Sequence, residues 1–180
     1  MPLPITIPAQ EAWDEAKEEF VQIKETKLLL EHSLLSVSKW EEKWHKPFLS
    51  KDKKTPEELL DYIRCMTISS NIDPEVYKYL TPQNIREVNA YIEDPATATW
   101  FSDTDKKQNR EIVTSEIIYY WITTFRINWK VEKWHLNRLL ALIRVMSIKN
   151  TPEKERSVAE INKEYHDLNE MRKKRFHSTG

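Results

Sequence analysis

Glycine is almost absent from this chain: the only glycine among its 180 residues is the last one, Gly180. Glycine adopts positive φ angles most readily and lets a backbone approach a ligand closely. Phosphate-binding loops, dinucleotide-binding turns and the nucleophile elbow of hydrolases all depend on internal glycines. The sequence therefore excludes nucleotide-binding and acyl-transfer enzymes of these kinds.

The remaining composition is that of a folded protein. Hydrophobic residues make up 39% of the chain, including seven Trp, seven Tyr and five Phe. A disordered segment would hold far fewer aromatic residues, so a real core is expected, in one domain or one domain with appendages. Lys and Arg number 28 against 29 Asp and Glu. This balance gives no overall field that favours nucleic acid or an anionic membrane.

Several absences point to a soluble, cytosolic protein. One cysteine, Cys65, allows no intramolecular disulfide and suits a reducing compartment. No apolar run approaches the ~20 residues that span a bilayer. The first residues lack the basic and apolar regions of a secretory signal.

The N-terminal segment predicts strands. Residues 3–7 alternate apolar and polar side chains, and residues 20–30 contain two further apolar runs. Together they predict a small antiparallel β element.

From residue 33 onward the apolar spacing becomes helical. Thr55-Pro56-Glu57, Asp73-Pro74-Glu75 and Thr81-Pro82-Gln83 are helix starts, with a capping side chain followed by proline. Residues 110–125 are apolar nearly all round and predict a central buried helix, and 132–148 predict a second strongly buried one.

These patterns predict a mainly α fold. We expect a compact multi-helix domain with a small N-terminal antiparallel β element and a C-terminal amphipathic helix. The expected divisions are 1–32 for the β element, 33–150 for the helical core domain, and 151–180 for a linker and the C-terminal helix.

The C-terminal helix carries a narrow apolar seam. Its residues follow 3-4-3 spacing, which makes about two heptads. Such a seam either packs back on the core or binds a partner helix. The seam residues are Val158, Ile161, Tyr165 and Leu168.

Charge is unevenly distributed along the chain. Residues 1–35 contain three Lys or Arg and seven Asp or Glu, a net charge of −4. Residues 105–149 contain nine and four, a net charge of +5. Most of this charge is expected on solvated surface, but the asymmetry could also guide head-to-tail packing.

Two identical tetrapeptides raise the question of metal binding. Glu42–His45 and Glu132–His135 both read Glu-Lys-Trp-His, and on a helix this spacing puts Glu and His on one face, as in carboxylate di-iron bundles. Glu116 is the only further contributor, and no convincing partner completes the site. We expect both histidines at helix ends, no bound metal and no cofactor. Glu116 is expected to pair with Arg138 or Arg144.

Other reactive groups do not converge either. His32, His166 and His177 form no triad with Cys65 or a serine at a recognisable spacing. The basic run 172–175 is expected to be a solvated helix end, and the aromatic residues lie in helical stripes instead of a base-stacking platform. We therefore expect no enzymatic activity and no nucleic-acid partner.

Several longer segments of the sequence resemble a family of tailed-bacteriophage proteins from the tail-gene region. Members of this family are described as tail assembly chaperones or as virion proteins. The resemblance covers roughly residues 20–175. Its segments are Leu30-Glu31-His32-Ser33-Leu34, Ser38-Lys39-Trp40-Glu41, Lys43-Trp44-His45-Lys46-Pro47-Phe48-Leu49, Ala98-Thr99-Trp100-Phe101, Glu116-Ile117-Ile118-Tyr119-Tyr120-Trp121, Trp134-His135-Leu136-Asn137-Arg138-Leu139-Leu140 and Ile148-Lys149-Asn150.

The resemblance implies a non-enzymatic helper that coats the long helical tape-measure protein and recruits tail-tube subunits, in the host cytoplasm during assembly. Self-association is a further expectation. A structural virion protein of the neck, tail or baseplate is the alternative, followed by a carboxylate-histidine metal enzyme. Tryptophan dominates binding hot spots, so the expected partner-binding residues, besides the C-terminal seam, are Trp40, Trp44, Trp100, Trp129 and Trp134.

Overall fold

The computed structural model describes residues 1–14, 18–101, 112–150, 165–166 and 171. The chain divides into two compact units, Met1–Met146 and Ser147–Gly180. Among the described residues, the secondary structure combines helices with two small antiparallel sheets. The prediction of a mainly α fold with one small β element is therefore wrong, and the fold is mixed α/β.

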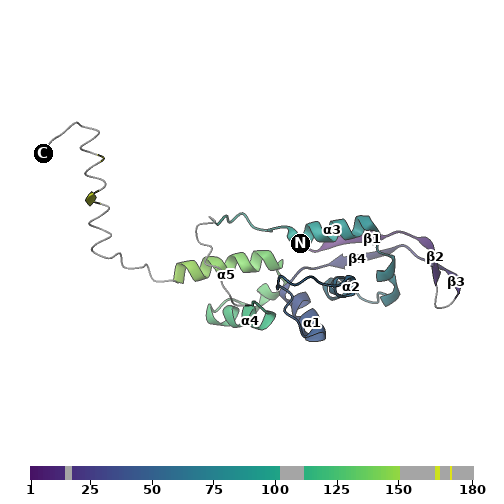
Figure 1. Ribbon diagram of the computed structural model, residues 1–180, viewed down its shortest axis with the longest axis horizontal. Helices are drawn as coiled ribbons and strands as arrows, with labels where there is room; N and C mark the ends of the chain where they lie inside the picture. The colour runs from purple at the N-terminus through teal and green to yellow at the C-terminus, as the bar shows by residue number, and fades with distance from the viewer. Residues whose placement is uncertain (15–17, 102–111, 151–164, 167–170, 172–180) are drawn as a thin grey trace. The chain divides into compact units, whose positions relative to one another are not determined.

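The two sheets are consecutive parts of one long hairpin. Strand β1 (Leu3–Ile7) pairs with β4 (Thr26–Leu30), and β2 (Gln10–Asp14) pairs with β3 (Glu19–Ile23). Both ladders keep the same register, so the pairing resumes in step after the break between them. The break contains Pro8, which has no N–H to donate to a ladder. Figure 1 shows β2 and β3 continuing the ribbon beyond β1 and β4.

The strand that the sequence did not indicate is β2. Its residues, QEAWD, put two apolar side chains next to each other, so no alternating pattern is visible. What defines β2 is its cross-strand partner β3 and the register inherited from β1 and β4. The overlooked strand is the physical reason why the sheet content was underestimated.

Two capped helices follow the ribbon. Helix α1 (Leu34–Trp44) begins after Ser33, whose backbone N–H donates to Ser36 Oγ at 3.0 Å. Helix α2 (Pro56–Met66) has a complete capping box: Thr55 Oγ accepts from the backbone of Glu58, and the Glu58 carboxylate accepts from the Thr55 N–H. The predicted helix start at Thr55-Pro56 is confirmed.

The other two predicted helix starts, at Asp73-Pro74 and Thr81-Pro82, begin helices of different kinds. The segment η1 (Pro74–Tyr79) is a 3₁₀ helix capped by Asp73, whereas α3 (Pro82–Glu93) is an α-helix capped by Thr81. Asn84, in the first turn of α3, donates from Nδ2 to the carbonyl oxygen of Thr6 at 3.1 Å. This bond ties α3 to the edge of β1.

The later helices are shorter and less buried than predicted. Helix α4 (Ser115–Thr124) buries Ser115, Ile118 and Ile122, but Tyr120 is 65% exposed. The prediction of a central buried helix is wrong because only one face of α4 meets the core. A 3₁₀ turn, η3 (Trp129–Lys133), precedes α5 (Leu136–Asn150), whose buried residues are Leu136, Leu139 and Ile143.

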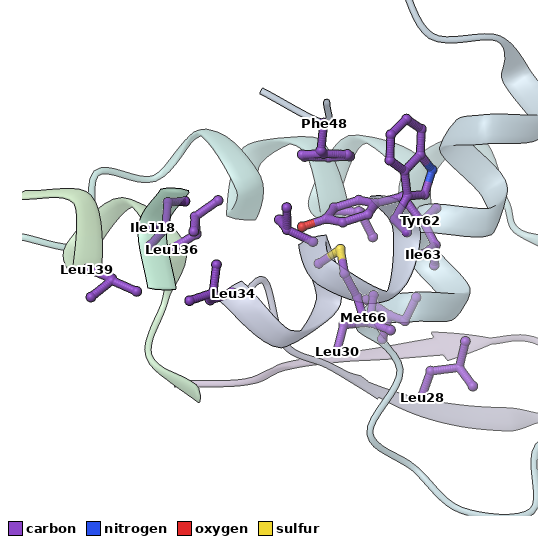
Figure 2. Packing of buried hydrophobic residues seen from close by; sticks show 14 of the residues in the cluster. Leu28, Leu30, Leu34, Phe48, Tyr62, Ile63, Met66, Ile118, Leu136 and Leu139 are labelled. Carbon is purple, nitrogen blue, oxygen red and sulfur yellow. The ribbon is translucent and has the colours of Figure 1, made fainter. Parts of the chain in front are cut away.

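The core lies between the hairpin and the helices (Figure 2). Leu28 and Leu30 contribute from β4, and the ring of Phe48 stacks on Tyr62 with 3.9 Å between centroids. Leu34 joins this cluster to the side chains of α4 and α5. One hydrophobic core therefore connects the strands to the helices within Met1–Met146.

A buried carboxylate joins three segments of this core. Glu41 is 7% exposed. Its Oε1 accepts a hydrogen bond from the backbone N–H of Phe48, and its Oε2 accepts one from the N–H of Ser115, both at 2.7 Å. Glu41 thus holds the loop after α1 and supplies the first turn of α4 with an acceptor.

Candidate protein-interaction surface

The five nominated tryptophans differ sharply in exposure. Trp40 is 1% exposed, and its Nε1 donates to the carbonyl oxygen of Glu58 at 2.8 Å. Trp44 is partly buried against the core and donates to Asp61 Oδ2 at 2.9 Å. The two indole rings stack at 6.2 Å. These contacts hold α1 against α2, and Trp40 presents no surface to a partner.

Two other tryptophans are open to solvent. Trp100 is 94% exposed and Trp129 is 54% exposed. Trp129 stacks on Tyr119 of α4, with ring centroids 5.4 Å apart and planes at 24°. We call the Tyr119–Trp129 pair the aromatic platform. An exposed tryptophan held by ring stacking is the kind of residue that binding hot spots use, and its partner Tyr119 is partly buried against the core.

The backbone between α4 and η3 positions this platform. Arg126 adopts a left-handed conformation with φ 54°, and the N–H of Ile127 donates back to the carbonyl oxygen of Ile122 at 2.9 Å. Asn128 then caps η3, since its Oδ1 accepts from the N–H of Lys130 at 2.9 Å. The chain reverses here, and the reversal brings Trp129 onto the ring of Tyr119.

The Tyr119 ring of the platform lies near the carboxylate of Glu132. Burial raises the pKa of Tyr119, and the nearby Glu132 carboxylate raises it further. The Tyr119 hydroxyl therefore stays protonated at neutral pH. Tyr119 belongs to the apolar stretch 110–125, and no local signal there indicates that Trp129 stacks on its ring.

Trp134 lines a separate cavity that is bordered by basic side chains. The guanidinium of Arg138 lies 4.4 Å from the centroid of the Trp134 ring. Both side chains line a cavity of about 360 Å³, which we call the basic pocket. Its other lining residues are Met1, Pro2, Glu31, Tyr91, Ala96, Lys133 and His135.

The two Glu-Lys-Trp-His tetrapeptides lie in different parts of the fold. Glu42 and His45 line a cavity of about 520 Å³ together with Glu116. His135 precedes α5 and His45 ends α1, so both histidines lie at helix ends, as expected. Within the part of the chain that the structure describes, no three His, Cys, Asp or Glu side chains gather in a way that could hold a metal ion.

The expected ion pair of Glu116 is not formed. Glu116 is exposed, and hydrogen bonds in the first turn of α4 lower its pKa. Arg138 stacks on Trp134, and Arg144 lies 4.0 Å from the ring centroid of Phe101. The prediction is wrong because Glu116 lies on the solvent face of α4, where a carboxylate needs no partner.

A buried histidine pair, which the sequence did not indicate, connects β4 to η3 and α5. His32 is 2% exposed, its Nδ1 is hydrogen-bonded to the Tyr62 hydroxyl, and its ring lies 5.0 Å from that of His135. His135 Nε2 donates to the carbonyl oxygen of Tyr91 at 2.9 Å. Nothing in the local sequence distinguishes these histidines, because their partners lie 30 or more residues away.

Acid should destabilise the fold through this pair. Burial, with a smaller contribution from His135, lowers the pKa of His32 to about 3 from the ordinary 6.5. In the unfolded chain, the His32 side chain is protonated below about pH 6.5. In the folded chain, it stays neutral down to about pH 3. Neutral His32 therefore makes its full contribution to the free energy of unfolding above pH 6.5. This contribution falls by about 2 kcal/mol between roughly pH 7 and 5.

Urea unfolding followed at several pH values measures this loss. The variant His32→Gln has no imidazole to titrate, so its free energy of unfolding should fall less steeply over the same range. Equal slopes for the variant and the wild type would contradict the assignment to His32.

The lone cysteine is unsuited to nucleophilic chemistry. Cys65 is partly buried, and burial with the nearby Asp61 raises the pKa of its thiol to about 11. The thiolate is the nucleophilic form, so Cys65 is inert at neutral pH and acts as a small packing residue against the core.

The predicted C-terminal seam is largely outside the described residues. Val158, Ile161 and Leu168 lie there, whereas Tyr165 is described, is helical and is 64% exposed. Among the described residues, no helix has both the length and the apolar character needed to cross a bilayer.

Comparison of the chain with protein-family models, with curated proteins and with solved structures gave no match.

Proposed function

We propose that this chain is a non-enzymatic assembly chaperone of a phage tail, which binds the tape-measure protein and tail-tube subunits during tail morphogenesis. The observation that carries the proposal is the aromatic platform, in which the half-exposed ring of Trp129 stacks on the partly buried ring of Tyr119. The sequence resemblance over residues 20–175 supplies the identity of the partner.

The platform suits a helical partner. A tape-measure protein is a long helix with apolar stripes, and such stripes aggregate when they are left exposed. An amphipathic helix binds by laying its apolar stripe against aromatic and aliphatic anchors. About half of the Trp129 surface is open to such a contact, and so is nearly the whole of Trp100.

The chemistry of the remaining cavities favours binding over catalysis. Cys65 is protonated at neutral pH, and His32 is enclosed by Tyr62 and His135. Catalysis needs a nucleophile, a base and an orienting group within reach of one substrate. In the 520 Å³ cavity Ser38, Glu42 and His45 all line the walls, but no hydrogen bond between these three side chains is found among the described residues.

Truncation of the platform should weaken capture of the partner without unfolding the chain. Trp129→Ala should weaken binding of the tape-measure protein by about 2 kcal/mol or more, roughly 30-fold in Kd. Because Trp129 is half exposed, the loss of folding stability should stay below about 1 kcal/mol. Co-expression with a tagged tape-measure protein, followed by titration of the purified partners, measures both effects.

The matched control is Trp13→Ala, since Trp13 is 52% exposed against 54% for Trp129 but lies on the β2–β3 hairpin. This variant should capture the tape-measure protein as the wild type does. Equal loss in both variants, or none in Trp129→Ala, would contradict the proposal.

Mass spectrometry of purified virions tests the alternative role as a structural virion protein. A chaperone leaves the tail when assembly ends, so the chain should be missing from mature particles. Its presence there in stoichiometric amounts would replace the chaperone role with a structural one.

A further inference from the structure

The β2–β3 hairpin exposes an aromatic pair that the proposed function does not use. Trp13 and Phe20 are cross-strand partners, with ring centroids 5.0 Å apart in an edge-to-face arrangement. They are 52% and 66% exposed. The neighbouring positions on the same face, Glu11 and Gln22, are exposed as well. No other segment in the described part of the chain therefore packs against this face of the hairpin.

The hairpin is also strongly acidic. Residues 10–23 contain five acidic residues and one lysine, a net charge of −4. The other charges of residues 1–35 cancel, since Lys24 and Lys27 balance Glu25 and Glu31. The acidic excess of the N-terminal region therefore lies within the hairpin segment, where Glu11 shares a face with Trp13 and Phe20.

The complementary charge lies in the segment that supplies Lys133, Trp134 and Arg138 to the basic pocket. Residues 126–144 contain five basic residues and one glutamate, a net charge of +4. Lys133 and Arg138 are exposed and line the pocket, together with the rings of Trp134 and Tyr91. Glu31 also lines it, and burial raises the pKa of that carboxyl. The pocket combines aromatic walls with a cationic rim, which suits an aromatic side chain flanked by carboxylates.

The hairpin cannot reach the pocket of its own chain. Pro2 lines the pocket and lies just before β1, whereas Trp13 lies at the far end of the same ribbon. Eleven residues of extended chain span on the order of 35 Å. Figure 1 agrees, since it shows β2 and β3 at the end of the ribbon remote from the N-terminus. An acidic hairpin and a basic pocket at opposite ends of one ribbon can meet only between molecules.

We infer that this protein self-associates head to tail, with the Trp13–Phe20 face of one copy seated in the basic pocket of the next. The occupant is a second copy because the hairpin segment is acidic, with Glu11 on the Trp13–Phe20 face, whereas Lys133 and Arg138 line the pocket. The two surfaces differ, so the contact is heterologous and leads to a ring or an open chain of subunits. This inference goes beyond the proposed function, because it uses neither the aromatic platform nor the tape-measure protein.

Sedimentation velocity of the full chain over a concentration series tests the inference. The wild type should form species larger than a dimer, and added salt should shift them toward monomer. The double variant Trp13→Ala/Phe20→Ala should associate at least tenfold more weakly, and so should Lys133→Glu/Arg138→Glu. The matched control is Lys51→Glu/Lys53→Glu, which changes the net charge equally at exposed positions outside the pocket.

A mixing experiment tests the head-to-tail geometry. The hairpin variant keeps an intact pocket and the pocket variant keeps an intact hairpin, so their mixture should form a one-to-one dimer that grows no further. A wild type that stays monomeric, a wild type that stops at a dimer, or a mixture that stays monomeric would overturn the inference.

The same variants separate this inference from the proposed function. Trp129→Ala should self-associate as the wild type does, whereas the hairpin variant should still capture the tape-measure protein. If the hairpin variant loses capture while the wild type is monomeric, the hairpin binds that other protein and the inference fails.

Discussion

Glu41→Ala should lower the free energy of unfolding by about 3–5 kcal/mol, because it leaves two buried backbone N–H groups without an acceptor. Those groups belong to Phe48 and Ser115, and both now donate to the carboxylate at 2.7 Å. Hydrogen bonds to a charged acceptor are stronger than neutral ones. The loss also removes the link between α1 and the first turn of α4. Urea unfolding monitored by tryptophan fluorescence measures the change.

Two further variants control this prediction. Glu41→Gln keeps one acceptor oxygen and should lose about half as much. Glu42→Ala removes the adjacent carboxylate, which is exposed, and should change the free energy of unfolding by less than about 0.5 kcal/mol. If Glu41→Ala were no more damaging than Glu42→Ala, the bridging role of Glu41 would be wrong.

Trp40→Ala should destabilise the fold by a similar amount, about 3–5 kcal/mol. The side chain is 1% exposed and packs edge-on against Phe48, with 5.1 Å between ring centroids. Its removal leaves a cavity under α1 and deprives the Glu58 carbonyl oxygen of its donor. Thermal and urea unfolding measure the effect.

The comparison with Trp129→Ala makes this prediction specific. Trp129→Ala should cost less than about 1 kcal/mol of stability, although the same side chain is removed. Similar stability losses for Trp40→Ala and Trp129→Ala would show that the division into core and surface tryptophans is wrong.

The sequence predicted those helices whose signals are local. Thr55-Pro56 and Thr81-Pro82 start α2 and α3, because a hydroxyl cap and a proline act within one turn. The strands at 3–7 and 26–30 carry alternating or continuous apolar side chains, and the structure pairs them. In each of these segments the neighbours in sequence determine the structure.

Features set by distant partners could not be predicted. Glu41 and Glu42 are adjacent and chemically identical, yet only Glu41 meets two N–H groups, one of them 74 positions away. Strand β2 has no pattern of its own and depends on β3. Burial of α4 was overestimated because a helix with aromatic residues on several faces can leave some of them in solvent, as Tyr120 shows.

The candidate site was only half predictable for the same reason. Tryptophan content identified residues worth testing, but periodicity could not separate Trp40 in the core from Trp129 at the surface. That distinction comes from the reversal at Arg126, where a left-handed residue turns the chain back over α4. No glycine marks this turn, so the usual sequence signal for it is missing.

Hydrogen–deuterium exchange of the full chain, alone and in complex with the tape-measure protein, is the most direct measurement of whether the chain acts by holding another protein on its aromatic platform. Amides of residues 119–133, which include the end of α4 and all of η3, should exchange more slowly in the complex. Unchanged exchange across these residues, with protection elsewhere or with no complex formed, would contradict that account.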